Sequence, residues 1–190
     1  MNELRKNALN LGASDAAIIP AAMISIEDGI VEMCREPLCE GYGKSAHCPP
    51  HAMKPAEARE FLKSFHTALL FKVDVSPSIL LSEERFEAFK VIYTITSQLE
   101  TIAIRSGYAM SRGFAAGSCK PVFCKDLSCA ALTDRTLCRY PSLARPSMES
   151  VGMNVFKLIR EVGWEIHTIV KNSDPEAIPN GVLAGIILVA

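Results

Sequence analysis

The chain has 190 residues, of which 49% are hydrophobic, and its formal net charge at pH 7 is −1. This length allows one domain with a substantial core, and the balanced charge excludes the basic surplus of nucleic-acid-binding proteins. Residues 1–15 lack the apolar stretch of a signal peptide, and the longest apolar run, residues 181–190, is about half the length of a membrane-spanning helix. We therefore expect one cytoplasmic domain over residues 1–190 that binds neither nucleic acid nor membrane. Because cytoplasmic thiols stay reduced, seven cysteines indicate metal or redox chemistry.

The first half of the chain predicts a helix, a strand, a cysteine-rich loop, a second helix and a second strand. Residues 2–11 have the spacing of an amphipathic helix. Residues 16–24 predict a strand, in which Pro20 favours a sheet edge or a bulge. A helix is expected to begin at Pro55, and residues 67–75 alternate as a strand with one buried face.

The second half repeats this order and adds a final strand. Ser82 is the expected cap of a helix that ends at Gly107. The other expected elements are a strand at 108–114, a helix at 147–163, a strand at 164–170 and a buried central strand at 182–189. The predicted fold is α/β (α+β): a central mixed sheet of about five strands, flanking helices and two cysteine-rich loops at 34–51 and 119–141.

The cysteine spacing repeats as well. Cys34, Cys39 and Cys48 are separated by four and eight residues, and so are Cys124, Cys129 and Cys138. No other identity accompanies this match. Coincidence is therefore a fair explanation of the pattern, with an internal duplication as the alternative.

The loop at 119–141 offers four thiols, from Cys119, Cys124, Cys129 and Cys138. Four thiolates fill one tetrahedral Zn²⁺ site or hold one [4Fe–4S] cluster. Structural zinc sites favour pairs of cysteines two residues apart, whereas no two of these are closer than five positions. The wider spacing favours iron–sulfur, with zinc as the alternative and buried cysteines without metal as the least favoured reading.

The loop at 34–51, CREPLCEGYGKSAHCPPH, supplies three cysteines and leaves a fourth ligand position open. Either His47 or His51 could complete a metal site with Cys34, Cys39 and Cys48. Three ligands with an open position also allow a metal to bind substrate. There are two alternatives to a separate metal site in this loop. In the first, all seven cysteines form one composite site; in the second, the thiols of this loop bind no metal and only pack beneath the site at 119–141.

Other motifs are weaker. The segment GYGKS at residues 41–45 ends like a phosphate-binding loop, but the glycine required five positions earlier is Leu38. His66 and His167 are expected to be structural histidines with satisfied hydrogen bonds. No catalytic residue is assigned.

The motif at Cys34–His51, together with CRYPSLARPSMESVGMNV at residues 138–155, resembles the DUF2284 family of predicted metal-binding proteins. The resemblance extends over essentially the whole chain. It implies a small cysteine-rich protein whose metal or iron–sulfur ligands are Cys34, Cys39, Cys48, Cys119, Cys124, Cys129 and Cys138.

Three functions are compatible with these observations. The first is a redox accessory protein that holds one or two iron–sulfur clusters and exchanges electrons with a partner protein. The second is an iron–sulfur enzyme with an open site at the three-cysteine loop, where Tyr42, Lys44, His47 or His51 handles protons. The third is a zinc-stabilised protein-interaction module. A cavity at the three-cysteine loop would favour the second over the first.

Overall fold

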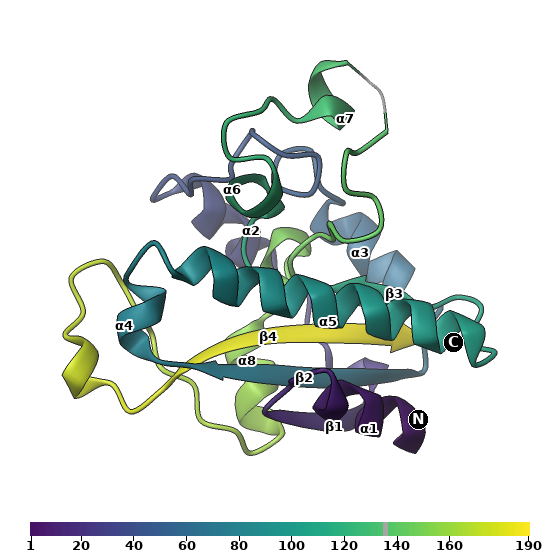
Figure 1. The fold of residues 1–190 in the computed structure, drawn as a ribbon. Helices are drawn as coiled ribbons and strands as arrows, with labels where there is room; N and C mark the ends of the chain where they lie inside the picture. Colours follow the sequence, from purple (N-terminus) through teal and green to yellow (C-terminus); the bar gives the residue numbers. More distant parts are fainter. Residues whose placement is uncertain (135–136) are drawn as a thin grey trace.

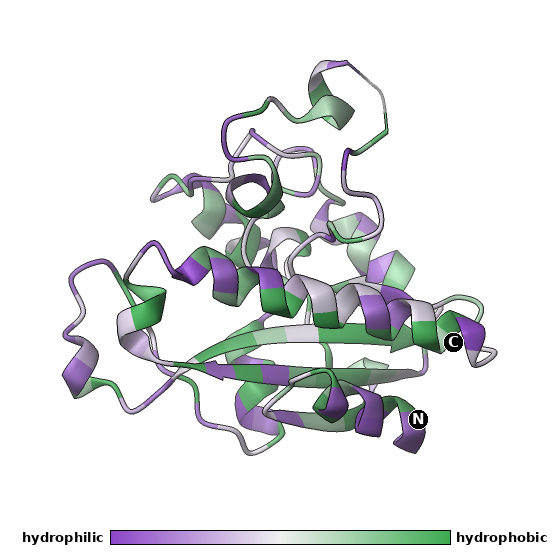
Figure 2. Cartoon of the chain, viewed as in Figure 1, coloured by the Kyte–Doolittle hydropathy of each residue, from purple (hydrophilic) through white to green (hydrophobic). Residues whose placement is uncertain are grey.

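The structure is a computed structural model that describes residues 1–134 and 137–190. Its centre is a four-stranded sheet of order β1-β2-β4-β3, in which every pair of neighbours is antiparallel (Figure 1). The strands are β1 (Asp15–Pro20), β2 (Thr67–Val75), β3 (Arg112–Phe114) and β4 (Gly181–Val189). Figure 2 shows hydrophobic residues along much of β4 and β2, as expected for strands that are covered on both faces.

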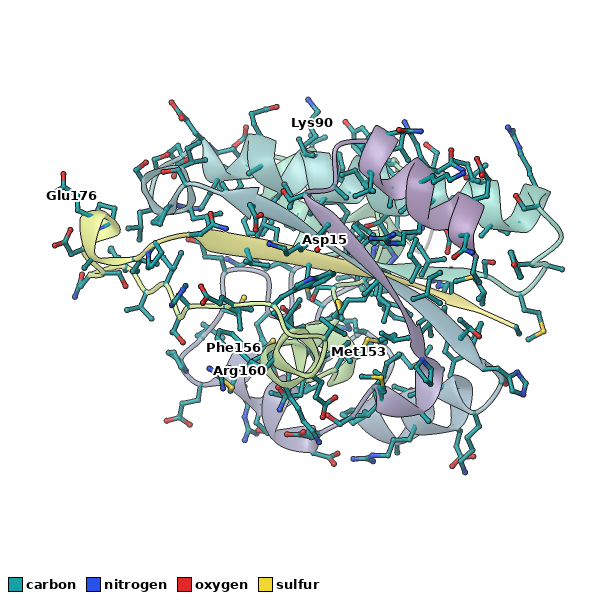
Figure 3. The ribbon with its side chains drawn as sticks, turned by 90° about the horizontal axis from the view of Figure 1, so that it is seen from below. Asp15, Lys90, Met153, Phe156, Arg160 and Glu176 are labelled. Atoms are coloured by element: carbon teal, nitrogen blue, oxygen red, sulfur yellow. The ribbon has the colours of Figure 1, made fainter. Side chains whose placement is uncertain are left out.

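Helices cover both faces of the sheet. The α-helices are α1 (Asn2–Asn10), α2 (Asp28–Arg35), α3 (Pro55–Leu62), α4 (Pro77–Leu80), α5 (Arg85–Arg105), α6 (Cys119–Phe123), α7 (Ala130–Thr133) and α8 (Val155–Glu161). Short 3₁₀ turns lie at η1 (Ala21–Met23), η2 (Glu149–Val151) and η3 (Pro175–Ala177). Figure 3 shows Lys90 of α5 and Arg160 of α8 on opposite sides of the sheet.

Two hydrophobic clusters hold these layers together. Leu69 and Phe71 of β2 pack with Ile92 and Leu99 of α5 on one face. The alternate residues of the strands, such as Leu70, pack on the other face against α3 and α8. Because side chains alternate along a strand, one continuous apolar strand serves both clusters.

The structure confirms the predicted fold class and several elements. The domain is a single α/β domain, with four antiparallel strands in place of about five mixed ones. The strand at 67–75 has the predicted bounds, and the strand near 182–189 is central in the sheet. Pro20 lies on the edge strand β1, as its missing N–H requires.

The predicted helix at 147–163 is wrong in its first half. Gly152 has φ +92°, so the chain turns between η2 and α8 instead of continuing as a helix. A β-carbon at Gly152 would lie 3.0 Å from the Glu27 carbonyl oxygen, and the Glu27 N–H donates to the Gly152 carbonyl at 2.8 Å. This close approach ties the turn to the start of α2, which the sequence analysis did not predict.

The predicted strand at 164–170 is also absent from the described sheet. Trp164 and Ile166 pack against the core, and the Trp164 indole donates to Asp15 at 3.0 Å. One buried face is enough to produce an alternating pattern, but no strand pairs with this segment. The expected repeat of five elements therefore fails at its last member.

The strand expected at 108–114 is confined to β3, because Tyr108–Ser111 forms a hydrogen-bonded turn. β3 pairs only with Ile186, Ile187 and Leu188 of β4. The first residues of β4 therefore have β2 on one side and no strand on the other, and the larger cavity described below lies beside them.

Within the described residues, no helix is both long enough and apolar enough to span a membrane. The segments that carry the cysteines lie above α5 in the view of Figure 1, at the end of the molecule away from α1 and β1. Of the predicted loop 119–141, residues 135–136 lie outside the described part of the chain.

Candidate metal centres

The two cysteine loops are in contact, and within the described residues three side-chain hydrogen bonds join them. Ser45 Oγ lies 3.2 Å from Cys119 Sγ, which brings a hydroxyl of the first loop to a thiol of the second. In the opposite direction, the Cys48 thiol donates to Ser118 Oγ at 3.3 Å. Because Ser118 and Cys119 are consecutive, the two groups of cysteines are neighbours in space.

Gly41 makes this contact between the two loops possible. A β-carbon at residue 41 would lie 2.7 Å from Ser118 Oγ and 3.0 Å from Cys48 Sγ. The backbone around it is held by hydrogen bonds from Tyr42 N–H to the Cys39 carbonyl and from Gly43 N–H to the Pro49 carbonyl. The glycine therefore permits contact between the loops, a role that the sequence analysis did not assign.

Cys34, Cys39 and Cys48 line one cavity of about 460 Å³. Other polar groups in its wall include Tyr42, Arg85, Ser118, Ser147, Glu149, Ser150 and His167. Its apolar wall comes from α4, α8, the segment 166–169 and the start of β4. This volume lies within the range of cavities that bind small organic molecules, about 300–1,000 Å³.

The three thiols influence one another electrostatically. The pKa of Cys34 is raised to about 11, mainly by burial and to a smaller extent by the nearby Cys39, Glu149 and Cys48. Burial also raises the pKa of Cys48, against the hydrogen bond to Ser118. At neutral pH the Cys34 and Cys48 thiols are therefore protonated in the metal-free chain, so metal binding to them would release protons.

Glu149 lies close to this group, and burial raises the pKa of its carboxyl, against hydrogen bonds to Ser147 and the backbone. Glu149 could not be identified from the sequence, because a single glutamate before a glycine turn carries no recognisable signal. Arg85 likewise has no sequence signal beyond its place in the predicted helix that begins at Ser82.

Cys119, Cys124, Cys129 and Cys138 line a second, smaller cavity of about 30 Å³. The Tyr140 N–H donates to Cys138 Sγ at 3.4 Å, which orients that thiol. Burial raises the pKa of Cys119 to about 12, with Cys48, Cys138 and Cys129 contributing in the same direction. All four thiols predicted from the second loop are therefore gathered around one space.

The two candidate histidines have different positions. His47 lines the four-cysteine cavity, where its Nδ1 lies 3.7 Å from Cys119 Sγ. Burial, with help from Arg112 and Arg145, lowers the pKa of His47 to about 4, so its imidazole is neutral at pH 7. His51 is exposed and lines neither cavity. Neither His47 nor His51 lines the cavity of Cys34, Cys39 and Cys48. Their positions therefore do not favour the prediction that one of them completes the three-cysteine site.

A buried ion pair anchors the second loop to the fold. Arg145 Nη2 lies 2.5 Å from Glu100 Oε2 on α5, and both side chains are almost fully buried. The other carboxylate oxygen of Glu100 accepts the Gly113 N–H at 2.8 Å, and Arg145 also donates to the Pro141 carbonyl. The chain after Cys138 is thus fixed to both α5 and β3.

The fit of a metal differs between the two cavities. Among residues 1–134 and 137–190, no three His, Cys, Asp or Glu side chains are arranged to hold a metal ion. The metal assignment therefore rests on the shared cavities and on the chemistry of the thiols. The space between the four thiols, about 30 Å³, is much smaller than the 460 Å³ cavity, and at either place the thiols would have to come closer together to share a metal.

All seven cysteines are free of disulfide bonds. They form two adjacent groups, of three and four thiols, which are joined through Ser118 and do not share one cavity. His167, expected to be satisfied, has a buried Nε2 for which the described residues supply no hydrogen-bond partner.

The family model described as "Predicted metal-binding protein (DUF2284)" matches residues 17–188. No curated protein and no solved structure matches the chain. The match includes both cysteine loops and all four strands except the first two residues of β1 and the last residue of β4. The chain therefore belongs to the DUF2284 family of predicted metal-binding proteins.

Proposed function

We propose that this protein is an iron–sulfur enzyme whose reactive centre is held by Cys34, Cys39 and Cys48 and opens onto the 460 Å³ cavity. The observation that carries the proposal is that three thiols, and no fourth, line a cavity large enough for a small organic molecule. Three thiolates on a four-iron core leave one iron without a protein ligand, and such an iron can bind a molecule from the cavity as a Lewis acid or redox centre.

The residues around the cavity have separate tasks in this proposal. Tyr42, Glu149 and His167 line it and are groups able to exchange protons with a bound molecule. Burial raises the pKa of Glu149, so its carboxyl holds a proton more readily than a carboxyl in water does. Ser118 holds the Cys48 thiol in place and thereby orients one ligand.

A second metal centre is proposed at Cys119, Cys124, Cys129 and Cys138. Four thiols fill all ligand positions, so this centre is closed and serves electron transfer or structure. The spacing along the chain favours a second iron–sulfur cluster, whereas the small space between the thiols favours one zinc ion. In the first case it passes electrons between the open centre and a redox partner protein.

A pure electron carrier is the second candidate function. It is supported by the exposed apolar side chains of Leu127 and Leu137, which flank the four-cysteine group and suit a docking contact. A carrier has no need for the larger cavity, and for this reason we prefer the enzyme.

The test is metal and sulfide analysis of protein isolated without oxygen. The proposal predicts about four iron atoms and four sulfides per chain at the three-cysteine centre, with broad absorption near 400 nm. The Cys34→Ser variant is expected to lose this iron, whereas Cys129→Ser retains it and loses the metal of the closed centre. A colourless protein that contains zinc and no sulfide would refute the enzyme and support the zinc-stabilised module.

The two candidate functions separate in a second measurement. Addition of cyanide, a small ligand for open iron sites, is expected to change the electron paramagnetic resonance spectrum of the reduced three-cysteine centre. In Cys34→Ser this change is absent. An unchanged wild-type spectrum at saturating cyanide would favour the carrier.

A further inference from the structure

We propose that the 460 Å³ cavity binds a small organic carboxylate: its carboxylate pairs with Arg85, and its hydrocarbon body packs against α8 and the start of β4. This inference deepens the proposed function by naming the class of molecule at the open centre. It depends on that function only for the role of the bound molecule, because none of the residues used below is a candidate metal ligand.

Arg85 supplies the charge that selects an anion. Among the lining residues described, it is the only lysine or arginine. Its side chain is 26% exposed, so it is largely removed from water. A guanidinium in such a position pairs with a carboxylate through two parallel hydrogen bonds, which gives both affinity and orientation.

The partners that Arg85 has within the chain leave this capacity available. Its Nη2 lies 3.9 Å from Glu40 and 3.5 Å from Glu83, both beyond good hydrogen-bonding distance, and those carboxylates are 75% and 72% exposed. Among the described residues, Arg85 donates one hydrogen bond, from Nη1 to the Ser82 carbonyl at 3.2 Å, and its guanidinium lies 4.7 Å from the Phe86 ring centroid. Exposed ion pairs contribute little, so a ligand carboxylate inside the cavity competes with them easily.

Much of the rest of the cavity lining is hydrocarbon. It is formed by Leu80 of α4, Val155 and Phe156 of α8, Ile166 and Ile169 of the following segment, and Val182 and Leu183 of β4. The wall exists because β3 pairs with β4 only from Ile186 onward, so no strand covers the start of β4 on that side. An apolar ligand body gains roughly 25 cal/mol for each Å² that it buries there.

The wall also contains an unsatisfied polar atom. His167 lines the cavity, and its buried Nε2 has no hydrogen-bond partner among the described residues. Buried polar atoms are nearly always paired, so this position is incomplete without a further group. A second polar atom on the ligand, such as a hydroxyl, suits this part of the wall better than hydrocarbon alone.

The test compares two probes of the same shape, 3-phenylpropionate and 3-phenylpropionamide, by isothermal titration calorimetry with anaerobically isolated protein. The acid is expected to bind at least about tenfold more tightly than the amide, because a charge-assisted pair replaces a neutral hydrogen bond. Propionate, which lacks the phenyl group, is expected to bind at least about tenfold more weakly than 3-phenylpropionate.

Three variants test whether the probes bind in this cavity and pair with Arg85. Arg85→Gln is expected to remove the preference for the acid and leave amide binding within about twofold. Lys90→Gln, a matched change at an exposed lysine of the same helix, is expected to keep the preference. Val182→Trp, which fills the apolar end of the cavity, is expected to abolish binding of both probes; circular dichroism checks that this variant is folded.

The inference is overturned when the wild-type protein binds acid and amide equally, binds neither, or keeps its preference in Arg85→Gln. Iron and sulfide are measured on the same samples. Loss of iron with retained probe selectivity would contradict the proposed function alone, and normal iron without selectivity would contradict this inference alone.

Discussion

Replacement of Gly41 by alanine tests the contact that joins the two cysteine loops. The added methyl group would lie 2.7 Å from Ser118 Oγ and 2.8 Å from Ser118 Cβ, about 1 Å inside normal contact distance. Neither loop can yield freely, because Ser118 caps α6 and residues 39–49 are held by their own backbone hydrogen bonds. We expect Gly41→Ala to lower the free energy of unfolding by about 1–3 kcal/mol, the usual cost of overpacking.

A double-mutant cycle shows whether the loss arises from this contact. Ser118→Gly removes the two nearest clashing atoms and costs a few tenths of a kcal/mol as a helix cap, with about 1 kcal/mol more for the lost hydrogen bond to Cys48. In the double variant most of the clash is relieved and the contact with Cys48 Sγ at 3.0 Å remains, so the two changes are expected to be non-additive by about 1–2 kcal/mol.

The assay is urea unfolding of the metal-free, reduced protein, together with iron analysis of the protein as isolated. Gly29→Ala is the control, since a β-carbon there has no atom within 4 Å and the residue lies within α2. It is expected to be neutral or stabilising by about 0.5–1 kcal/mol. Unchanged stability and iron content in Gly41→Ala, or additive effects in the double variant, would refute the loop contact.

Three further variants test separate parts of the structure. Arg145→Met leaves Glu100 buried without its partner and is expected to cost about 3–5 kcal/mol in urea unfolding; the double variant Arg145→Met/Glu100→Leu should recover most of this, and a loss below about 1 kcal/mol would contradict the ion pair. His51→Ala is expected to leave metal content unchanged, because this exposed side chain lines neither cavity, and a metal loss would place it among the ligands. His47→Ala is expected to alter the spectrum of the centre at Cys119 alone, since its imidazole lies beside that thiol, so a change confined to the three-cysteine centre would reverse the assignment.

Local sequence patterns were sufficient to predict a helix or strand where that element buries side chains at regular intervals. The strand at 67–75 alternates so strictly that its bounds follow from the sequence, and the apolar run of β4 could only be a strand covered on both faces. The cysteine spacing likewise predicted two groups of three and four thiols, although Cys34 lies in α2 and Cys119 begins α6 instead of lying in loops.

The errors occur where a distant residue decides the local structure. The helix predicted at 147–163 ends at Gly152 because the Glu27 backbone occupies the adjacent space, and nothing near Gly152 in the sequence reveals that contact. Trp164 and Ile166 have the alternation of a strand, but the pattern shows only that one face is buried. The presence of a pairing partner is a property of the whole sheet.

The sequence by itself determined the family, the fold class and which residues carry sulfur, because these depend on residue type, spacing and periodicity. Only the tertiary structure decided which thiols share a cavity, that His47 lies with the four-cysteine group, and that Arg85 and His167 face the same space as Cys34. Those relations join residues up to 133 positions apart along the chain, from 34 to 167. They arise from the packing of α5, α8 and a shortened β3 around the start of β4, which no local pattern encodes.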